Sequence, residues 1–169
     1  MELKLATKED LPKLKLMFNG VVQNMQNNGI FIWNEDYPFE EFENDIENSN
    51  LYIIESAGTI VASFALLDST DGSECFTWKN KSVKSKYISR IGVNANHLKQ
   101  GIGSLVLYEA EKLAKENKAK FLRLLVVDCN TPAINLYLKN GYTQVSGIRI
   151  EEIPEQNKSL VELGFEKQL

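Results

Sequence analysis

The segment FLRLLVV, residues 121–127, constrains the fold of this chain more than any other stretch. All of its residues except Arg123 are apolar. Such a run predicts a β-strand buried on both faces, because a strand with one wet face alternates apolar and polar residues. Helical spacing of apolar residues precedes it at residues 102–117 and follows it at residues 132–140. A buried strand between two amphipathic helices predicts an α/β fold in which helices cover both faces of a sheet.

The remaining pattern adds strands and helices to this core. Apolar-rich or alternating runs predict further strands, at residues 3–5, 51–55, 59–67, 87–93, 142–150 and 161–168, with a short one at residues 75–78. Start signals at Thr7 and Asp10 open a helix that closes at residues 27–29, and Pro38 opens a shorter one. A loop containing Pro154 joins the last two strands. The order of these elements predicts a mixed central sheet.

Length and composition indicate an ordinary globular protein. The 169 residues predict a single domain, residues 1–169, and 43% hydrophobic with 25% charged residues is a typical mixture. A net charge of −4 and a pI of about 5.2 disfavour nucleic-acid binding unless lysines cluster. Four lysines do lie close together in the sequence, and we interpret them as a solvated loop or edge strand: Lys79, Lys81, Lys84 and Lys86.

Few residues are available to hold a metal ion or form a disulfide. His97 is the only histidine, and Cys75 and Cys129 are far apart in the sequence. A tetrahedral zinc site needs about four nitrogen or sulfur ligands, so structural zinc and a disulfide framework are both disfavoured. The N-terminus has no signal-peptide pattern, and no apolar run approaches the roughly 20 residues of a membrane span. We therefore expect a cytoplasmic protein without a metal or a membrane partner.

The segment HLKQGIGSLVLYEAEKLAKE, residues 97–116, places Gly101 and Gly103 directly before a predicted helix. Glycines there either serve a tight turn or let a ligand approach the backbone. The N–H groups at the start of a helix form an anion site suited to phosphates. The dinucleotide pattern GxGxxG fails because its third position is Val106, and the Walker A pattern fails because no GK pair follows. Both nucleotide-binding alternatives are thereby weakened.

Two longer segments resemble the GNAT family of N-acetyltransferases, which use acetyl-coenzyme A (acetyl-CoA). These are SRIGVNANHLKQGIGSLVLYEAEKLA and FLRLLVVDCNTPAINLYLKNGYTQV, within residues 89–145. The family pattern is Arg or Gln, two residues, Gly, one residue, then Gly or Ala. Gly101 and Gly103 match it, whereas Leu98 stands where the family has Arg or Gln. Lys99 or Gln100 is the candidate to replace that side-chain contact to the pyrophosphate.

The resemblance implies a set of residues that bind acetyl-CoA. The pyrophosphate would lie on backbone amides of residues 100–104, and the pantetheine arm would lie beside the strand that ends at residues 91–93. A backbone N–H of that strand would polarise the thioester carbonyl. For Gly92 a plain bulge in the strand remains an equal alternative. The implied cofactor residues are Ile91, Gly92, Val93, Lys99, Gln100, Gly101, Ile102, Gly103, Ser104, Asn130, Ala133 and Tyr137.

Tyr137 is the implied catalytic residue. The expected reaction is direct attack of an amine on the thioester, with a CoA thiolate as the leaving group. A positioned phenol can protonate or hydrogen-bond that sulfur. The alternative is that Tyr137 is a core aromatic residue of an amphipathic helix. Thr131 is predicted as the N-cap of this helix, followed by the favoured first-turn proline, Pro132. Asn130 matches a family asparagine near the cofactor, and its alternative is ordinary helix capping.

The acceptor amine is expected to bind near residues 30–37 and the loop of residues 68–86. Aromatic side chains beside carboxylates would suit a cationic amine, but they would equally serve as a hydrophobic staple between two helices. A general base is not identified by the sequence, and the carboxylates are more ordinarily surface groups. The candidate substrate residues are Phe31, Trp33, Tyr37, Glu35 and Glu74, with Asp36 as a further candidate base.

Three functions remain open from the sequence. The resemblance favours transfer of an acetyl group from acetyl-CoA to a primary amine of a small molecule or peptide, by a monomer or homodimer. The second is a CoA-binding sensor or scaffold of the same fold without catalysis. The third is a nucleotide-dependent enzyme. The identity of the amine does not follow from the fold, because this fold serves many acceptors.

Overall fold

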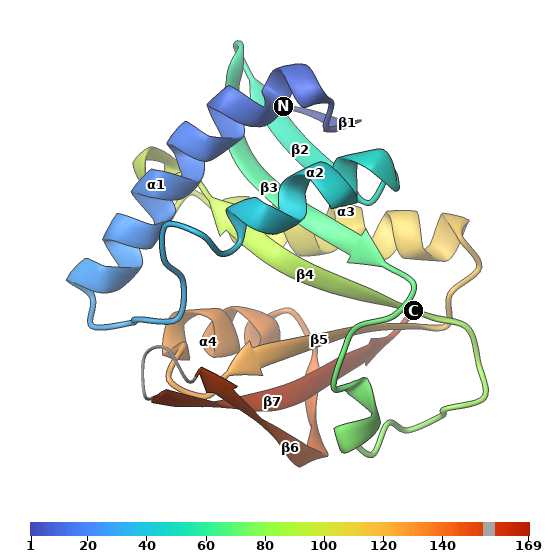
Figure 1. Ribbon diagram of the computed structural model, residues 1–169. Helices are drawn as coiled ribbons and strands as arrows, with labels where there is room; N and C mark the ends of the chain where they lie inside the picture. The colour runs from blue at the N-terminus through green and yellow to red at the C-terminus, as the bar shows by residue number, and fades with distance from the viewer. Residues whose placement is uncertain (154–157) are drawn as a thin grey trace. The chain divides into compact units, whose positions relative to one another are not determined.

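The computed structural model describes residues 1–153 and 158–169 of the chain, so the expected loop at Pro154 lies outside the described residues. In these residues the chain forms a mixed β-sheet and α-helices (Figure 1). The strands are β1 (Glu2–Leu5), β2 (Leu51–Ser56), β3 (Thr59–Leu67), β4 (Ser85–Val93), β5 (Phe121–Val127), β6 (Thr143–Ile153) and β7 (Lys158–Gln168). The helices are α1 (Leu11–Asn27), α2 (Phe39–Glu47), α3 (Ile102–Glu116) and α4 (Thr131–Lys139), with 3₁₀ turns η1 (Lys8–Asp10), η2 (Ser73–Cys75) and η3 (Ala95–His97).

The strands form one sheet in the order β1-β2-β3-β4-β5-β7-β6. The ladder between β4 and β5 is parallel, and the β1–β2, β2–β3, β5–β7 and β6–β7 ladders are antiparallel. The predicted mixed α/β architecture is therefore confirmed. The described residues divide into two compact units, and β4 and α3 each run from one into the other. The single domain expected from the length stays a prediction.

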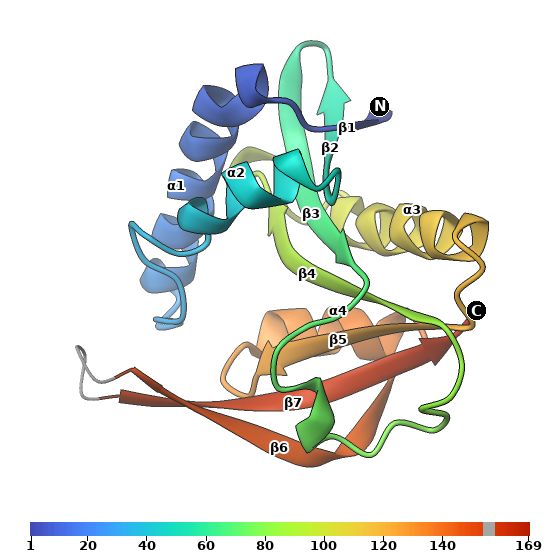
Figure 2. The same cartoon turned by 45° about the vertical axis from the view of Figure 1, so that its right-hand side comes forward.

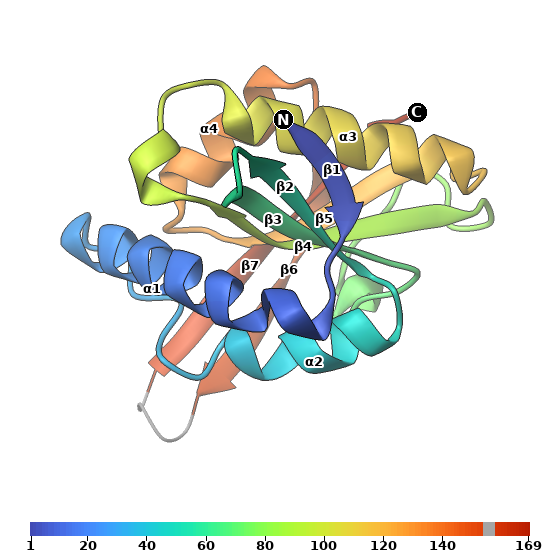
Figure 3. The same cartoon turned by 90° about the horizontal axis from the view of Figure 1, so that it is seen from above.

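Unit 1 comprises residues 1–66 and 89–110. Its strands β1, β2 and β3 form an antiparallel meander. Helices α1 and α2 lie on one side of this meander, and the beginning of α3 lies on the other side (Figure 3). The fully buried Phe18 of α1 joins the two helices, because its ring centroid lies 4.8 Å from that of Phe42 on α2. Burial of these large apolar side chains is the main force that holds the helices together.

Unit 2 comprises residues 67–88 and 111–169. Strand β7 lies between β5 and β6, and successive residues of a strand point to opposite faces. A side chain at Gly164 would meet Phe76, next to η2, whereas Phe165 contacts Tyr137 of α4. Helix α4 and the η2 segment therefore cover opposite faces of this part of the sheet (Figure 2).

The strand predicted at residues 75–78 is wrong. The alternation of Phe76 and Trp78 imitates a half-buried strand, and both side chains are indeed buried. Gly72, with a left-handed φ of 77°, instead starts the 3₁₀ turn η2. The Trp78 indole N–H then donates to the Ser73 carbonyl at 2.8 Å, and the only ladder contact of this segment among the described residues is a single bridge from Thr77.

Two smaller expectations also need correction. The N-cap of α4 is Asn130 rather than Thr131, because the Asn130 side chain accepts a hydrogen bond from the Ala133 N–H at 3.4 Å. The four lysines are not all solvated. Lys86 is buried and pairs with Asp68 at 2.8 Å, because β4 is an inner strand of the sheet and not a loop or an edge strand.

Candidate functional site

The turn before α3 has the backbone that an anion site requires. Gly101 has a φ of +80°, which disfavours any residue with a side chain. A Cβ built on Gly101 would meet no atom within 4 Å, so the turn faces open space. The first bond along the helix runs from the Leu105 N–H to the Gly101 carbonyl. The N–H groups of Ile102 and Gly103 precede that bond and have no partner within the helix.

The loop leading to this turn is anchored by Asn94, a residue that the sequence reasoning missed. Its side-chain amide donates to the Ile60 carbonyl at 3.0 Å, and its side-chain oxygen accepts from the Asn96 N–H at 3.1 Å. Its own N–H donates to the Val61 carbonyl of β3. The Asn-x-Asn pattern typical of such side-chain turns was the available signal. The loop is thereby attached to the sheet, while Leu98, Lys99 and Gln100 remain exposed.

Strand β4 is irregular beside the predicted pantetheine segment. Arg90 has a φ of +50° within the strand, a conformation that side chains rarely adopt. Gly92 follows, and a Cβ there would lie 2.5 Å from Cζ of Phe18. The tight approach of this aromatic ring is sufficient reason for glycine at position 92, whatever else the strand binds. The flanking Ile91 and Val93 are partly exposed.

Gly92→Ala is expected to destabilise the protein by about 1–3 kcal/mol, because the added methyl group overpacks against Phe18. Thermal or denaturant unfolding measures the change. Gly20→Ala on α1 is the matched control: its nearest neighbour would be Ala95 Cβ at 4.0 Å, and alanine stabilises a helix by about 0.5–1 kcal/mol over glycine. Combining Gly92→Ala with Phe18→Leu should cost less than the sum of the single changes. Strict additivity would show that Phe18 is not the cause.

Helix α4 carries the predicted residues of unit 2. Tyr137 is 7% exposed, and its ring centroid lies 6.1 Å from that of Tyr142 and 6.2 Å from that of Phe165. Burial raises the pKa of the Tyr137 phenol above its usual value of about 10. The phenol therefore keeps its proton at neutral pH. The N–H of Ala133 donates to the Asn130 side chain in the hydrogen bond that caps the start of the same helix.

The aromatic residues between α1 and α2 differ in environment. The Trp33 ring lies 5.7 Å from Phe18 and 6.3 Å from Tyr37, so it continues the aromatic cluster of the two helices. This is the contact expected of a hydrophobic staple. Phe31 is 60% exposed, and the carboxylates of Glu35 and Asp36 are exposed as well. Glu74 lies in unit 2, where it lines a pocket with Trp78.

A buried ion pair fixes α2 against the irregular part of β4. Arg90 donates to Asp45 through Nε and Nη2, both at 2.7 Å, and also interacts with the Tyr37 side chain. Burial is the largest single influence and lowers the pKa of the Arg90 guanidinium, but the charge of Asp45 and the hydrogen bonds to Asp45 and Tyr37 together outweigh it, so the pKa of Arg90 is raised. The pair joins residues 45 positions apart, and nothing in the sequence pattern indicates it.

The predicted cofactor residues fall into two groups. Unit 1 holds residues 91–93 and 99–104, which lie at the end of β4 and around the start of α3. Unit 2 holds Asn130, Ala133 and Tyr137, which α4 and its cap carry. In residues 1–153 and 158–169 no three side chains of His, Cys, Asp or Glu gather where they could share a metal ion.

A model of the acetyltransferase (GNAT) family matches residues 19–142. This span includes β4, the glycine turn, α3, β5 and α4. The chain belongs to the GNAT acetyltransferase family. No curated protein matches its sequence.

Solved structures share the fold over almost the whole chain. An acetyltransferase of the GNAT family from Streptococcus agalactiae is 19% identical, with a TM-score of 0.80, over 99% of this chain and 95% of that one. A ribosomal-protein-alanine N-acetyltransferase from Brucella melitensis is 21% identical, with a TM-score of 0.69, over 100% of both chains. A protein from Salmonella typhimurium, described as an acetyltransferase with its cofactor acetyl-CoA, is 18% identical, with a TM-score of 0.67, over 99% and 93%. At these identities the likeness establishes the fold.

The described helices also bear on the membrane question. None of those in residues 1–153 and 158–169 combines the length and the hydrophobicity that a membrane crossing requires. Cys75 and Cys129 are both exposed and unbridged.

Proposed function

We propose that this protein is an acetyl-CoA-dependent N-acetyltransferase that acetylates a primary amine of a small molecule or peptide. The proposal rests on family membership and on the backbone at Gly101. A left-handed glycine facing open space, at the first turn of a fifteen-residue helix, suits a pyrophosphate that approaches the amides closely. The Salmonella neighbour with acetyl-CoA supports the same choice of cofactor.

In this proposal the residues around Gly101 bind the pyrophosphate, and acetyl-CoA supplies an activated thioester. Backbone N–H groups of Ile102 and Gly103 donate to phosphate oxygens, and Lys99 adds a positive charge. Backbone groups of Ile91 and Val93 pair with the pantetheine amides and hold the arm in place. A backbone N–H of this strand donates to the thioester carbonyl and so stabilises the negative charge that develops on its oxygen.

The chemistry requires one bond to form and one to break. The neutral amine nitrogen of the acceptor attacks the carbonyl carbon, a C–N bond forms, the C–S bond breaks, and the amine proton passes to water or a carboxylate. The departing thiolate needs a hydrogen-bond donor. A buried Tyr137 serves in this role, because its raised pKa keeps it protonated. A thiol has a pKa of about 8.5, so the phenol stabilises the thiolate by donating a hydrogen bond more readily than by transferring its proton.

Tyr137→Phe is expected to lower kcat by about 100-fold while KM for acetyl-CoA changes by less than about threefold. Only the hydroxyl is lost, and the ring contacts with Tyr142 and Phe165 remain. Steady-state release of free CoA measures the effect. Tyr108→Phe, at an exposed tyrosine on α3, is the control and should leave the rate unchanged. A Tyr137→Phe enzyme of undiminished kcat would remove Tyr137 from the mechanism.

Calorimetric titration with acetyl-CoA, followed by a CoA-release assay across a panel of primary amines, tests the proposal as a whole. Binding together with turnover supports the enzyme. Tight binding with no turnover on any amine favours the sensor or scaffold instead. A folded protein that does not bind acetyl-CoA contradicts both.

A further inference from the structure

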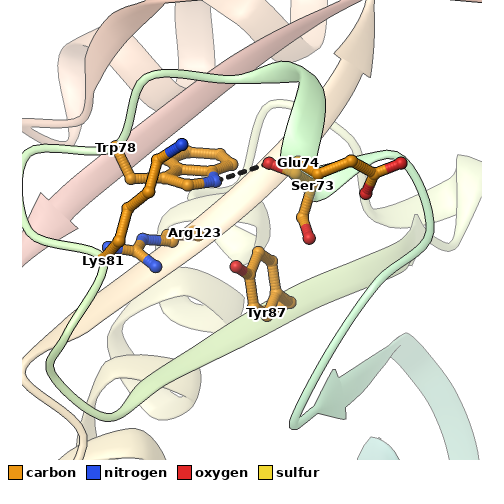
Figure 4. A pocket seen from close by; sticks show the side chains of 6 residues that line it. All are labelled: Ser73, Glu74, Trp78, Lys81, Tyr87 and Arg123. Atoms are coloured by element: carbon orange, nitrogen blue, oxygen red, sulfur yellow. Dashed lines mark hydrogen bonds between the residues drawn. The ribbon is translucent and has the colours of Figure 1, made fainter.

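Unit 2 contains a pocket of about 240 Å³ on the face of the sheet that carries η2. It lies between the η2 loop and the first residues of β4 and β5, where Tyr87 and Arg123 are register partners in the parallel ladder. Six side chains line it: Ser73, Glu74, Trp78, Lys81, Tyr87 and Arg123 (Figure 4). Apart from Glu74, none of these residues belongs to the predicted site.

Arg123 is the polar exception in the apolar strand β5, and it is only 3% exposed. Its Nε donates to Glu166 at 3.2 Å, and its Nη2 donates to the Asn80 carbonyl at 2.6 Å. Trp78 covers one face of the guanidinium, 4.9 Å from its ring centroid. A guanidinium presents five N–H donors, so two bonds leave donors available on the side that faces the pocket.

Two hydroxyl groups point into the same space. Figure 4 shows the Tyr87 hydroxyl directed toward Arg123 and the Ser73 hydroxyl directed into the centre of the pocket. Tyr87 is 8% exposed. Within the part of the chain that the structure describes, neither hydroxyl makes a hydrogen bond. A hydroxyl that makes no hydrogen bond within the protein is available to donate one, so this arrangement is suited to a ligand that accepts hydrogen bonds.

The charged groups around the pocket favour an anion at its centre. Glu166 is occupied, because it accepts from Arg123 and from the Lys79 N–H at 2.8 Å. Lys81 and Glu74 are exposed at the mouth, and the Glu74 carboxylate is directed away from the Ser73 and Tyr87 hydroxyls (Figure 4). The interior therefore offers the guanidinium and two hydroxyl donors, and the one carboxylate among the lining side chains, that of Glu74, is directed away from them.

We propose that this pocket binds the carboxylate group of a small organic acid. A planar guanidinium matches the two oxygens of a carboxylate, and the volume admits a small group of this kind.

A binding experiment tests the pocket without any catalysis. The chain has two tryptophans, so Trp33→Phe leaves Trp78 as the only indole and as a reporter inside the pocket. Propionate should change its fluorescence with a Kd of about 1–10 mM, whereas the uncharged propionamide should not. Tyr87→Phe should raise the propionate Kd by about tenfold, and Tyr108→Phe should leave it unchanged. Equal responses to propionate and propionamide, or a Kd insensitive to Tyr87→Phe, would overturn the proposal.

Discussion

Gly101→Glu is expected to reduce the affinity for acetyl-CoA by at least about 100-fold. The added side chain would project into the open space that Gly101 leaves beside the first turn of α3, and its carboxylate would repel the pyrophosphate. Loss of two hydrogen bonds to a charged group costs about 3 kcal/mol or more, which corresponds to this change in Kd. Calorimetric titration measures it directly.

The control for Gly101→Glu must reproduce its backbone strain. Gly58, in the turn between β2 and β3, has a φ of +79°, and a Cβ built on it would likewise meet no atom within 4 Å. Gly58→Glu therefore introduces the same side chain at the same conformational cost, about 1–2 kcal/mol, and should leave the acetyl-CoA affinity within about twofold. Equal loss of binding in both variants would indicate general unfolding. Unchanged binding by Gly101→Glu would refute a phosphate site at this turn.

Asp45→Ala is expected to destabilise the protein by about 3–5 kcal/mol, because it leaves the Arg90 guanidinium buried without its counter-charge. Asp45 is 1% exposed, and both of its hydrogen bonds to Arg90 measure 2.7 Å. For a chain of this length the loss corresponds to a fall in Tm of about 10 °C. Thermal unfolding monitored by circular dichroism gives the value.

Another ion pair of α2 provides the matched control. Glu47 pairs with Lys8 at 2.8 Å on the surface, and an exposed pair of this kind contributes less than about 1 kcal/mol. Glu47→Ala should therefore have little effect on Tm. The double variant Asp45→Ala with Arg90→Met should recover much of the lost stability, since it removes the unpaired charge. If Asp45→Ala were no more harmful than Glu47→Ala, the pair would not be a buried structural link.

Most elements of the fold followed from local patterns. Strand β5 was predicted over its observed bounds, because only a strand covered on both faces combines seven nearly continuous apolar residues with flanking helices. The segment at residues 75–78 failed, because an alternation of two aromatic residues fits a buried loop as well as a strand. The N-cap of α4 was misplaced by one residue, since Asn130 and Thr131 are both good capping residues and local sequence does not choose between them.

The candidate site was predictable to a smaller extent. The glycine turn is a local motif, and the left-handed φ of Gly101 explains why a glycine stands at this position. The role of Gly92 was not predictable, because the ring of Phe18 that requires it lies more than seventy positions earlier in the chain. The predicted residues 91–93, 99–104, Asn130, Ala133 and Tyr137 remain predictions as cofactor ligands, and Tyr137 as the catalytic residue.

The sequence by itself determined the order of the elements, the glycine turn before α3 and the family resemblance, because these depend on residues that are neighbours along the chain. Tertiary structure alone decided which distant side chains meet. Arg90 reaches Asp45 across 45 positions, and Arg123 meets Trp78 and Glu166 from separate segments. Folding removes these side chains from water, and a buried charge is stable only when it is paired. Because the partners are far apart in the sequence, no local pattern indicates these pairs.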